Sequence, residues 1–234
     1  MHPYFPRRWY LMAMCLIVSV SLQLAFPGVA FANHYAQLGV EIQVSNYGAW
    51  AIIGTSDPYV GSDVSWELVR SAAFDPYRMV QTGWIKASYC YGGSVSAFWE
   101  YFNPSLVGNG GYRNGCAPYH PSGDNRYTNQ YDGYTGYWGH DFNGYCFHSE
   151  PASYPNFTQG QHVVFYGETS HTSSSVQMGG ASPSMPILLS NLRFKPGSIT
   201  PAGNWTYITN QTVIRRDICG GYNLNDCPYA YNWN

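Results

Sequence analysis

Charged side chains are scarce in this chain of 234 residues. Lys and Arg number 11 and Asp and Glu number 13, which together make up 10% of the sequence and give a formal net charge of −2. A nucleic-acid-binding domain needs a basic stripe or patch to neutralise phosphates, and no such stripe is present. The sequence therefore predicts no nucleic-acid partner. A surface with few ionisable groups also changes its charge little in acid, which suits an exported protein.

Long apolar runs are absent except at the N-terminus. Arg7 and Arg8 precede the apolar run "WYLMAMCLIVSVSLQLAF", and Ala30–Ala32 supplies a small-x-small cleavage site. This order predicts a secretory signal peptide over residues 1–32 and a secreted, extracellular chain that begins near Asn33. An uncleaved membrane anchor is the alternative, and export by either the general or the twin-arginine route fits the sequence. No later run approaches the roughly 20 residues that cross a bilayer, so we expect no membrane contact after cleavage.

Motifs for metals, cofactors and common nucleophiles are missing as well. The sequence contains no H-E-x-x-H, no G-x-S-x-G and no glycine-rich phosphate loop. The six histidines after residue 32 show no paired spacing on one helical face. We therefore predict neither a metal nor a cofactor. These histidines are His34, His120, His140, His148, His162 and His171.

Five cysteines follow the predicted signal peptide. In an exported chain they are expected to form disulfides. Cys219 and Cys227 flank the turn-rich segment "GGYNLND" and are predicted to pair. Cys90, Cys116 and Cys146 are odd in number, so one of them is free or pairs between chains, and the sequence leaves open which one.

Helical periodicity is nearly absent, and short β-rich runs alternate with clusters of Gly, Pro, Asn, Asp and Ser. This spacing predicts an all-β chain, an antiparallel sandwich or barrel. Residues 103–159 differ because Tyr, Gly, Asn and Pro dominate there, and we expect a long ordered insertion with one strand near 137–146. The other predicted strands are 40–44, 50–53, 65–72, 78–88, 94–102, 161–168, 186–194, 205–209 and 211–217.

Two nearby motifs draw attention to Gln81. "VQTGW" spans residues 80–84, "FWEYFNP" spans 98–104, and Trp66 lies fifteen residues before Gln81. This combination resembles the glutamic peptidases called eqolisins. In that family a Leu-Gln-Thr-Gly-aromatic strand carries the catalytic glutamine, and a Trp-x-Glu-Trp-Tyr-Pro strand follows it. Ile85 departs from the family pattern, which has an aspartate at that position.

A later motif, "HVVFYGE", places Glu168 where the family carries its catalytic glutamate. The segment after Glu168, "TSHTSSSVQMGG", is similar to neprosin, a prolyl endopeptidase of the same glutamic-peptidase group. The resemblance covers roughly Trp66 to Phe194. The chain thus resembles both branches of this group, the eqolisins in its first motif and neprosin in its second.

The resemblance implies Gln81 and Glu168 as the catalytic residues. A glutamate can take a proton from water and return it to the leaving amine, and a glutamine amide can donate to the developing oxyanion. Trp66, Trp99 and Glu100 are candidate substrate-binding residues. Tryptophans in such strands are more often core residues than pocket residues, and Glu100 could equally be a cross-strand polar partner.

The expected protein is a secreted, monomeric, acid-active glutamic endopeptidase with a polypeptide substrate. The resemblance implies a concanavalin-like antiparallel β-sandwich, formed by residues 33–234 as a single domain. Cleavage beside proline is part of what the neprosin-like segment implies. The alternatives are a lectin-like carbohydrate-binding sandwich and a catalytically inactive cell-surface relative, because one fold hosts all three functions.

Overall fold

The computed structural model describes residues 34–60, 64–72, 78–106, 111–171, 187–199, 204–210, 212–216 and 230–233. For residues 34–38, 66–67, 168–171, 187–188, 212–216 and 230–233 it describes the backbone alone. All of these residues belong to the unit Asn33–Asn234. The predicted signal peptide and the predicted Cys219–Cys227 pair lie outside the described residues.

The first sheet has seven strands, and every pairing within it is antiparallel. Its central strands come from residues 64–102 and from residues 160–171. The latter strand inserts between the strands formed by residues 34–46 and 64–72. In spatial order the strands are β13 (Thr212–Arg216), β1 (His34–Asn46), β10 (Gly160–His171), β3 (Val64–Ala72), β4 (Met79–Ala87), β5 (Ser96–Phe102) and β6 (Tyr112–Cys116).

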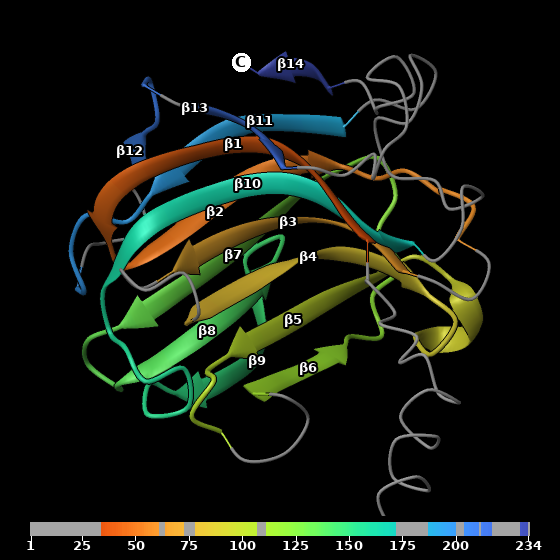
Figure 1. Cartoon of the computed structure of the whole chain (residues 1–234). Coiled ribbons are helices and arrows are strands. Elements are labelled where there is room, and N and C mark those ends of the chain that lie inside the picture. Colours follow the sequence, from red (N-terminus) through yellow and green to blue (C-terminus); the bar gives the residue numbers. More distant parts are fainter. Residues whose placement is uncertain are drawn as a thin grey trace, which may run out of the picture. The chain divides into compact units, whose positions relative to one another are not determined.

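The second sheet lies behind the first in Figure 1. Its path is antiparallel throughout, and one short strand off this path, β14 (Ala230–Trp233), pairs with β11 in parallel. The predicted all-β antiparallel sandwich is confirmed. In spatial order the strands of the path are β12 (Thr206–Tyr207), β11 (Ile187–Phe194), β2 (Gly48–Gly54), β7 (Asp124–Asp132), β8 (Tyr137–Phe142) and β9 (Tyr145–Pro151).

The main core lies between the two sheets. Side chains of a strand alternate between its faces, so every second residue of each strand points inward. The first sheet contributes Val69, Trp84 and Phe165, and the second contributes Tyr127 and Leu189, all at most 1% exposed. Burial of each such side chain stabilises the fold by about 1.5–3 kcal/mol.

The outer face of the first sheet is also partly buried. A second apolar cluster there includes Leu68, Phe98, Val164 and Tyr166. As a result β4 is buried at all positions but one, although its residues alternate between the two faces. Polar side chains on the outer face of this sheet are therefore held in an apolar setting.

The Tyr-, Gly- and Asn-rich segment 103–159 is more regular than expected, because it contains four strands instead of one. β7 and β8 are integral parts of the second sheet, and Asn143-Gly144 joins β8 to β9. Both turn residues have positive φ, 51° and 91°, as a two-residue type I′ hairpin requires. Inward positions of β7 are occupied by Tyr127 and Asn129, so this strand lacks the alternation of aliphatic and polar residues that usually indicates a strand.

Cys90 and Cys116 form a disulfide, which confirms the expected disulfide bonding and settles one pairing that the sequence left open. Cys146 is exposed and free. Disulfides persist in oxidising compartments, so the bond is compatible with an extracellular location. Among the described residues no helix has the length and apolar character needed to span a membrane.

Candidate functional site

Gln81 lies in the middle strands of the first sheet and is 2% exposed. Its register partners are Arg70 on β3 and Glu100 on β5, so the three residues share the outer face of the sheet. Arg70 Nε donates to Gln81 Oε1 at 2.9 Å, and Gln81 Nε2 donates to Glu100 Oε1 at 2.6 Å. The amide therefore connects a cation to a carboxylate.

The chemistry of the two neighbours fixes the orientation of this amide. A guanidinium can only donate hydrogen bonds, so the oxygen of Gln81 must face Arg70. An ionised carboxylate can only accept, so the nitrogen must face Glu100. The reverse orientation would oppose donor to donor and acceptor to acceptor. Gln81 is thus held in one orientation by two charge-assisted hydrogen bonds.

Two further side chains extend this arrangement. Asn114 Nδ2, on the edge strand β6, donates to Glu100 Oε2 at 3.3 Å. The Tyr166 hydroxyl donates to Gln81 Oε1 at 3.3 Å and also contacts Arg70 Nη2, while Arg70 Cζ lies 4.7 Å above the Tyr166 ring. We call these five residues the Gln81 cluster.

Close approach of strand β1 helps to place Tyr166. Gly39 of β1 is the register partner of Tyr166. A Cβ at Gly39 would lie 2.1 Å from the carbonyl oxygen of Phe165 and 2.4 Å from Tyr166 Cβ. Glycine at position 39 is therefore required for β1 to pack against β10 at this point.

The charges of the Gln81 cluster are distributed unevenly. The described part of the chain provides no carboxylate within 4.0 Å of Arg70, whose hydrogen bonds go to neutral groups. Both oxygens of Glu100 accept from amides. The pKa of Tyr89 is raised by burial and then by the negative charge of Glu100, so this phenol lies close enough to sense the carboxylate. Tyr89 is 64% exposed and follows the end of β4 at Ala87.

Glu168 and Trp66 are placed by backbone register alone. Glu168 pairs with Trp66, and Trp66 pairs with Ile85 on β4. Both therefore occupy positions on the same sheet face as Gln81, but Glu168 is two strands away and is displaced along the sheet by four residue positions, the offset from Gln81 to Ile85. Standard strand spacing and rise put the Cα atoms of Gln81 and Glu168 about 16 Å apart. At Glu168 the structure describes the backbone alone.

Trp99 occupies the opposite face of the sheet from Gln81. Its register partner is Thr82, so it points toward the interior of the sandwich. Its indole stacks on the His148 ring at a centroid distance of 3.5 Å and an angle of 5°. Trp99 and Glu100 are the candidate substrate-binding residues whose side chains the structure describes, and of these two only Glu100 contacts Gln81.

Trp99 belongs to an interior group that we call the His140 cluster, together with Tyr101, His140, His148 and Glu150. His140 is 0% exposed, and neither ring nitrogen has a hydrogen-bond partner among the described residues. Burial, followed by the charge of His148, lowers the pKa of His140 well below its usual value. Burial also lowers the pKa of His148, against the opposing effect of Glu150 at 3.4 Å.

The described residues contain no group of three His, Cys, Asp or Glu side chains arranged to hold a metal ion.

Three members of the Gln81 cluster were not predicted from the sequence, namely Arg70, Asn114 and Tyr166. For Arg70 a signal was available, because Asp75-Pro76 is typical of a turn and a hairpin centred there places Arg70 opposite Gln81. Asn114 and Tyr166 depend on strand order, which no local motif encodes.

Comparison with known proteins leaves the family open. No protein-family model matches the chain, and no curated protein sequence matches it. Solved structures resemble it only at low identity and with TM-scores below 0.5, so no conclusion about this chain rests on them.

The chain is similar to scytalido-glutamic peptidase with a peptide-based transition-state analogue, at 11% identity and a TM-score of 0.41 over 69% of this chain and 74% of that one. It is similar to a glycoside hydrolase family 16 endo-glucanase from Bacteroides ovatus at 10% identity and a TM-score of 0.40, over 58% of this chain and 66% of that one. The chain thus spans just under two thirds of the endo-glucanase. It is also similar to CG-16, a homodimeric agglutinin from chicken liver, at 11% identity and a TM-score of 0.35, over 66% of this chain and 99% of that one.

Proposed function

We propose that this chain is a secreted, monomeric peptide hydrolase that works through Gln81 and a glutamate on the outer face of the first sheet. The observation that carries the proposal is the Arg70–Gln81–Glu100 chain of hydrogen bonds, in which the motif glutamine directly contacts a carboxylate. The motif resemblance implies Glu168 as the base, whereas the hydrogen bond to Gln81 favours Glu100. We assign the base to Glu100.

In this proposal Glu100 activates water for attack on the scissile carbonyl. The water oxygen bonds to the carbonyl carbon, and its proton passes to Glu100. Gln81 Nε2 has two hydrogens and gives one to Glu100, so the second is free to donate to the oxyanion. Glu100 then returns the proton to the nitrogen as the C–N bond breaks, which leaves a free amine and a carboxylic acid.

Arg70 acts on this chemistry through Gln81. A guanidinium hydrogen bond to the amide oxygen draws electron density from the amide nitrogen and strengthens its N–H groups as donors. Arg70 is therefore a positioning residue, which orients and polarises Gln81 without touching the substrate. By register, Glu168 lies on the same sheet face as Gln81, two strands away.

The test is hydrolysis of denatured protein and of proline-containing peptides by the purified protein, from about pH 3 to 7. Wild type is expected to cleave with a maximum in acid, as the glutamic-peptidase resemblance implies. Gln81→Ala and Glu100→Gln are each expected to lower kcat by about 100-fold or more. Circular dichroism of each variant checks that the fold is retained.

Glu168→Gln is the matched control for the choice of base. Retention of most activity in Glu168→Gln and loss in Glu100→Gln would support the assignment. The reverse result would return the base to Glu168. Absence of hydrolysis by wild type at every pH would overturn the peptidase proposal.

A further inference from the structure

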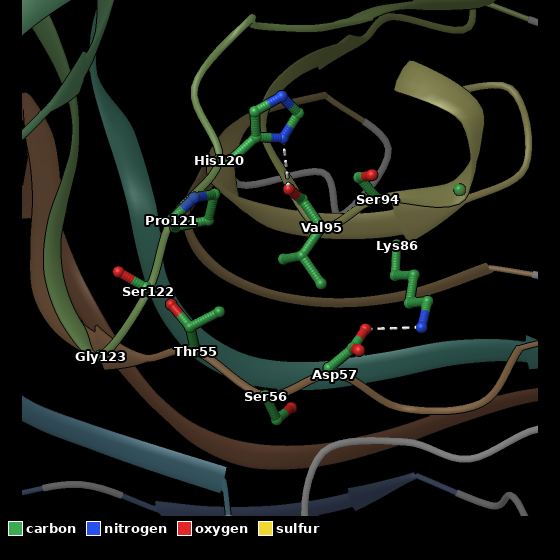
Figure 2. Close-up of a pocket in the computed structure, with 11 residues that line it drawn as sticks. Thr55, Ser56, Asp57, Lys86, Ser94, Val95, His120, Pro121, Ser122 and Gly123 are labelled. Carbon is green, nitrogen blue, oxygen red and sulfur yellow. Dashed lines mark hydrogen bonds and ion pairs between the residues drawn. The ribbon is translucent and has the colours of Figure 1, made fainter.

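A cleft of about 580 Å³ lies apart from the Gln81 cluster (Figure 2). Lys86, one of its lining residues, stands five positions beyond Gln81 on β4 and so belongs to the opposite face of the strand. The volume falls within the usual range for small-molecule sites, about 300–1,000 Å³. We call this space the Asp57 cleft. The lining residues that matter for binding are Asp57, Lys86, Ser94, Val95 and His120.

The walls of the cleft are fixed by hydrogen bonds between segments distant in sequence. Thr55 N donates to the carbonyl of Gly123 at 2.9 Å. Asn125 Nδ2 lies 3.3 Å from Thr55 Oγ1 and 3.0 Å from the carbonyl of Ser122. The Cys90–Cys116 disulfide restrains the chain that leads into Gly93. The cleft is therefore preformed, which limits the entropy cost of binding a ligand.

The charges in the cleft cancel. Lys86 Nζ pairs with Asp57 Oδ1 at 2.5 Å, and the Asp57 side chain is 77% exposed. His120 Nδ1 lies 3.2 Å from the carbonyl oxygen of Val95, as Figure 2 shows. Because a carbonyl only accepts, Nδ1 carries a proton, and in that tautomer of the imidazole Nε2 is the acceptor. An anionic ligand would find no unpaired cation here.

The remaining lining combines hydroxyl groups with apolar surface. Hydroxyls come from three residues, Thr55, Ser94 and Ser122, whereas the Ser56 hydroxyl is buried. Val95 lies between His120 and the Lys86–Asp57 pair in Figure 2. Beside the cleft, the Tyr91 ring is 47% exposed and packs against the His120 ring in a T-shaped arrangement at 5.7 Å. An exposed aromatic ring next to mixed donors and acceptors suits a ligand that has both apolar faces and hydroxyl groups.

We propose that the Asp57 cleft binds a neutral saccharide. Sugar rings present C–H faces to an aromatic ring, and their hydroxyls both donate and accept. Asp57 and His120 Nε2 accept such hydroxyls, Lys86 donates to them, and Tyr91 contacts a ring face. This site is independent of the proposed hydrolase chemistry, so a secreted hydrolase with this cleft would be held on glycan-bearing material near its substrates.

The test is a titration of the purified protein with a panel of neutral oligosaccharides, namely cello-, xylo-, manno- and chito-oligosaccharides, followed by calorimetry and by NMR. At least one is expected to bind with a Kd between about 10 μM and 1 mM. Asp57→Asn and Tyr91→Ala are each expected to weaken that binding by about tenfold or more. Tyr145→Ala removes an exposed tyrosine ring elsewhere, on β9, where it is 75% exposed, and is expected to leave the Kd unchanged.

Glu100→Gln separates this proposal from the hydrolase proposal, because it is expected to lose hydrolysis and retain saccharide binding. No binding to any member of the panel would overturn the saccharide site. Binding that survives both cleft variants, or that is stronger for an oligosaccharide of glucuronic acid than for neutral sugars, would overturn it as well.

Discussion

Gln81 and His140 are both buried polar side chains, but their surroundings differ. Gln81, 2% exposed on the outer face of the first sheet, has a donor at its oxygen and an acceptor at its nitrogen. His140, 0% exposed inside the sandwich, has no hydrogen-bond partner for either ring nitrogen among the described residues. One site holds a polar group in a single orientation, and the other leaves a polar group unmatched.

The difference separates a site organised for chemistry from one that limits stability. A buried polar group without a partner costs about 1–3 kcal/mol. A satisfied network is rigid and polarises its members. We therefore expect changes in the Gln81 cluster to appear mainly in activity and changes in the His140 cluster to appear mainly in stability and its pH dependence.

The largest effect on stability is expected from the disulfide that anchors β6, the strand that carries Asn114. The double substitution Cys90→Ser with Cys116→Ser should lower the free energy of unfolding by about 3 kcal/mol, because the bond closes a loop with a sequence separation of 26. Urea denaturation measures the change. Cys146→Ser, which removes only a free thiol, is the control and should shift the midpoint little. Equal midpoints for the double variant and wild type would show that the bond is not formed.

Arg70→Met should affect activity next most strongly. Without the guanidinium, Gln81 loses the group that fixes and polarises its amide, so kcat should fall by about tenfold to 100-fold with little change in KM. Arg70→Lys keeps the charge and should restore part of the loss. A kcat for Arg70→Met equal to that of wild type would remove Arg70 from the account.

Acid should destabilise the fold through His140. Its folded-state pKa is lower than its unfolded one, so below about pH 6.5 the unfolded chain binds more protons and the free energy of unfolding decreases as the pH falls. His140→Leu should flatten this part of the pH profile, as measured by Tm between about pH 5 and 7.5. Asp141 has a pKa raised by burial, so its contribution has the opposite sign and remains in the variant. The same slope with and without His140 would contradict the assignment.

The smallest effect is expected where the two regions meet, at Gly115. A Cβ at this position would lie 2.8 Å from Trp99 Nε1, so Gly115→Ala should push the indole away from His148 and destabilise the fold by about 1 kcal/mol. Tryptophan fluorescence and urea denaturation report the change. Gly139→Ala is the control, because its Cβ would meet Cys146 Sγ at an ordinary 3.6 Å. Identical stabilities of the two variants would contradict the close packing of Trp99 on β6.

The strands rich in aliphatic residues could be predicted from the sequence because their patterns are local. β4 and β10 were located within one to three residues at each end. β7 was not predicted, because its inward positions are filled by Tyr127 and Asn129, which a search for Val, Ile and Leu alternation overlooks. Asn129 is accommodated inside because its amide bonds to Ser71 and to the carbonyl of Val69.

The candidate site was predictable only in part for a related reason. The motif identified Gln81 and placed Glu100 close to it in sequence, and a hairpin brings these two into contact. Tyr166 joins them from 85 residues away, because β10 inserts between β1 and β3. Strand order of this kind depends on the whole chain, and no local pattern of residues encodes it.

The most direct test of the central claim is a double-mutant cycle in kcat between Gln81 and Glu100. If the two side chains act as one unit on the attacking water, the protein with both Gln81→Ala and Glu100→Gln should be no slower than the slower single variant. Effects that multiply in the double variant, or a Glu100→Gln protein with the kcat of wild type, would contradict the account.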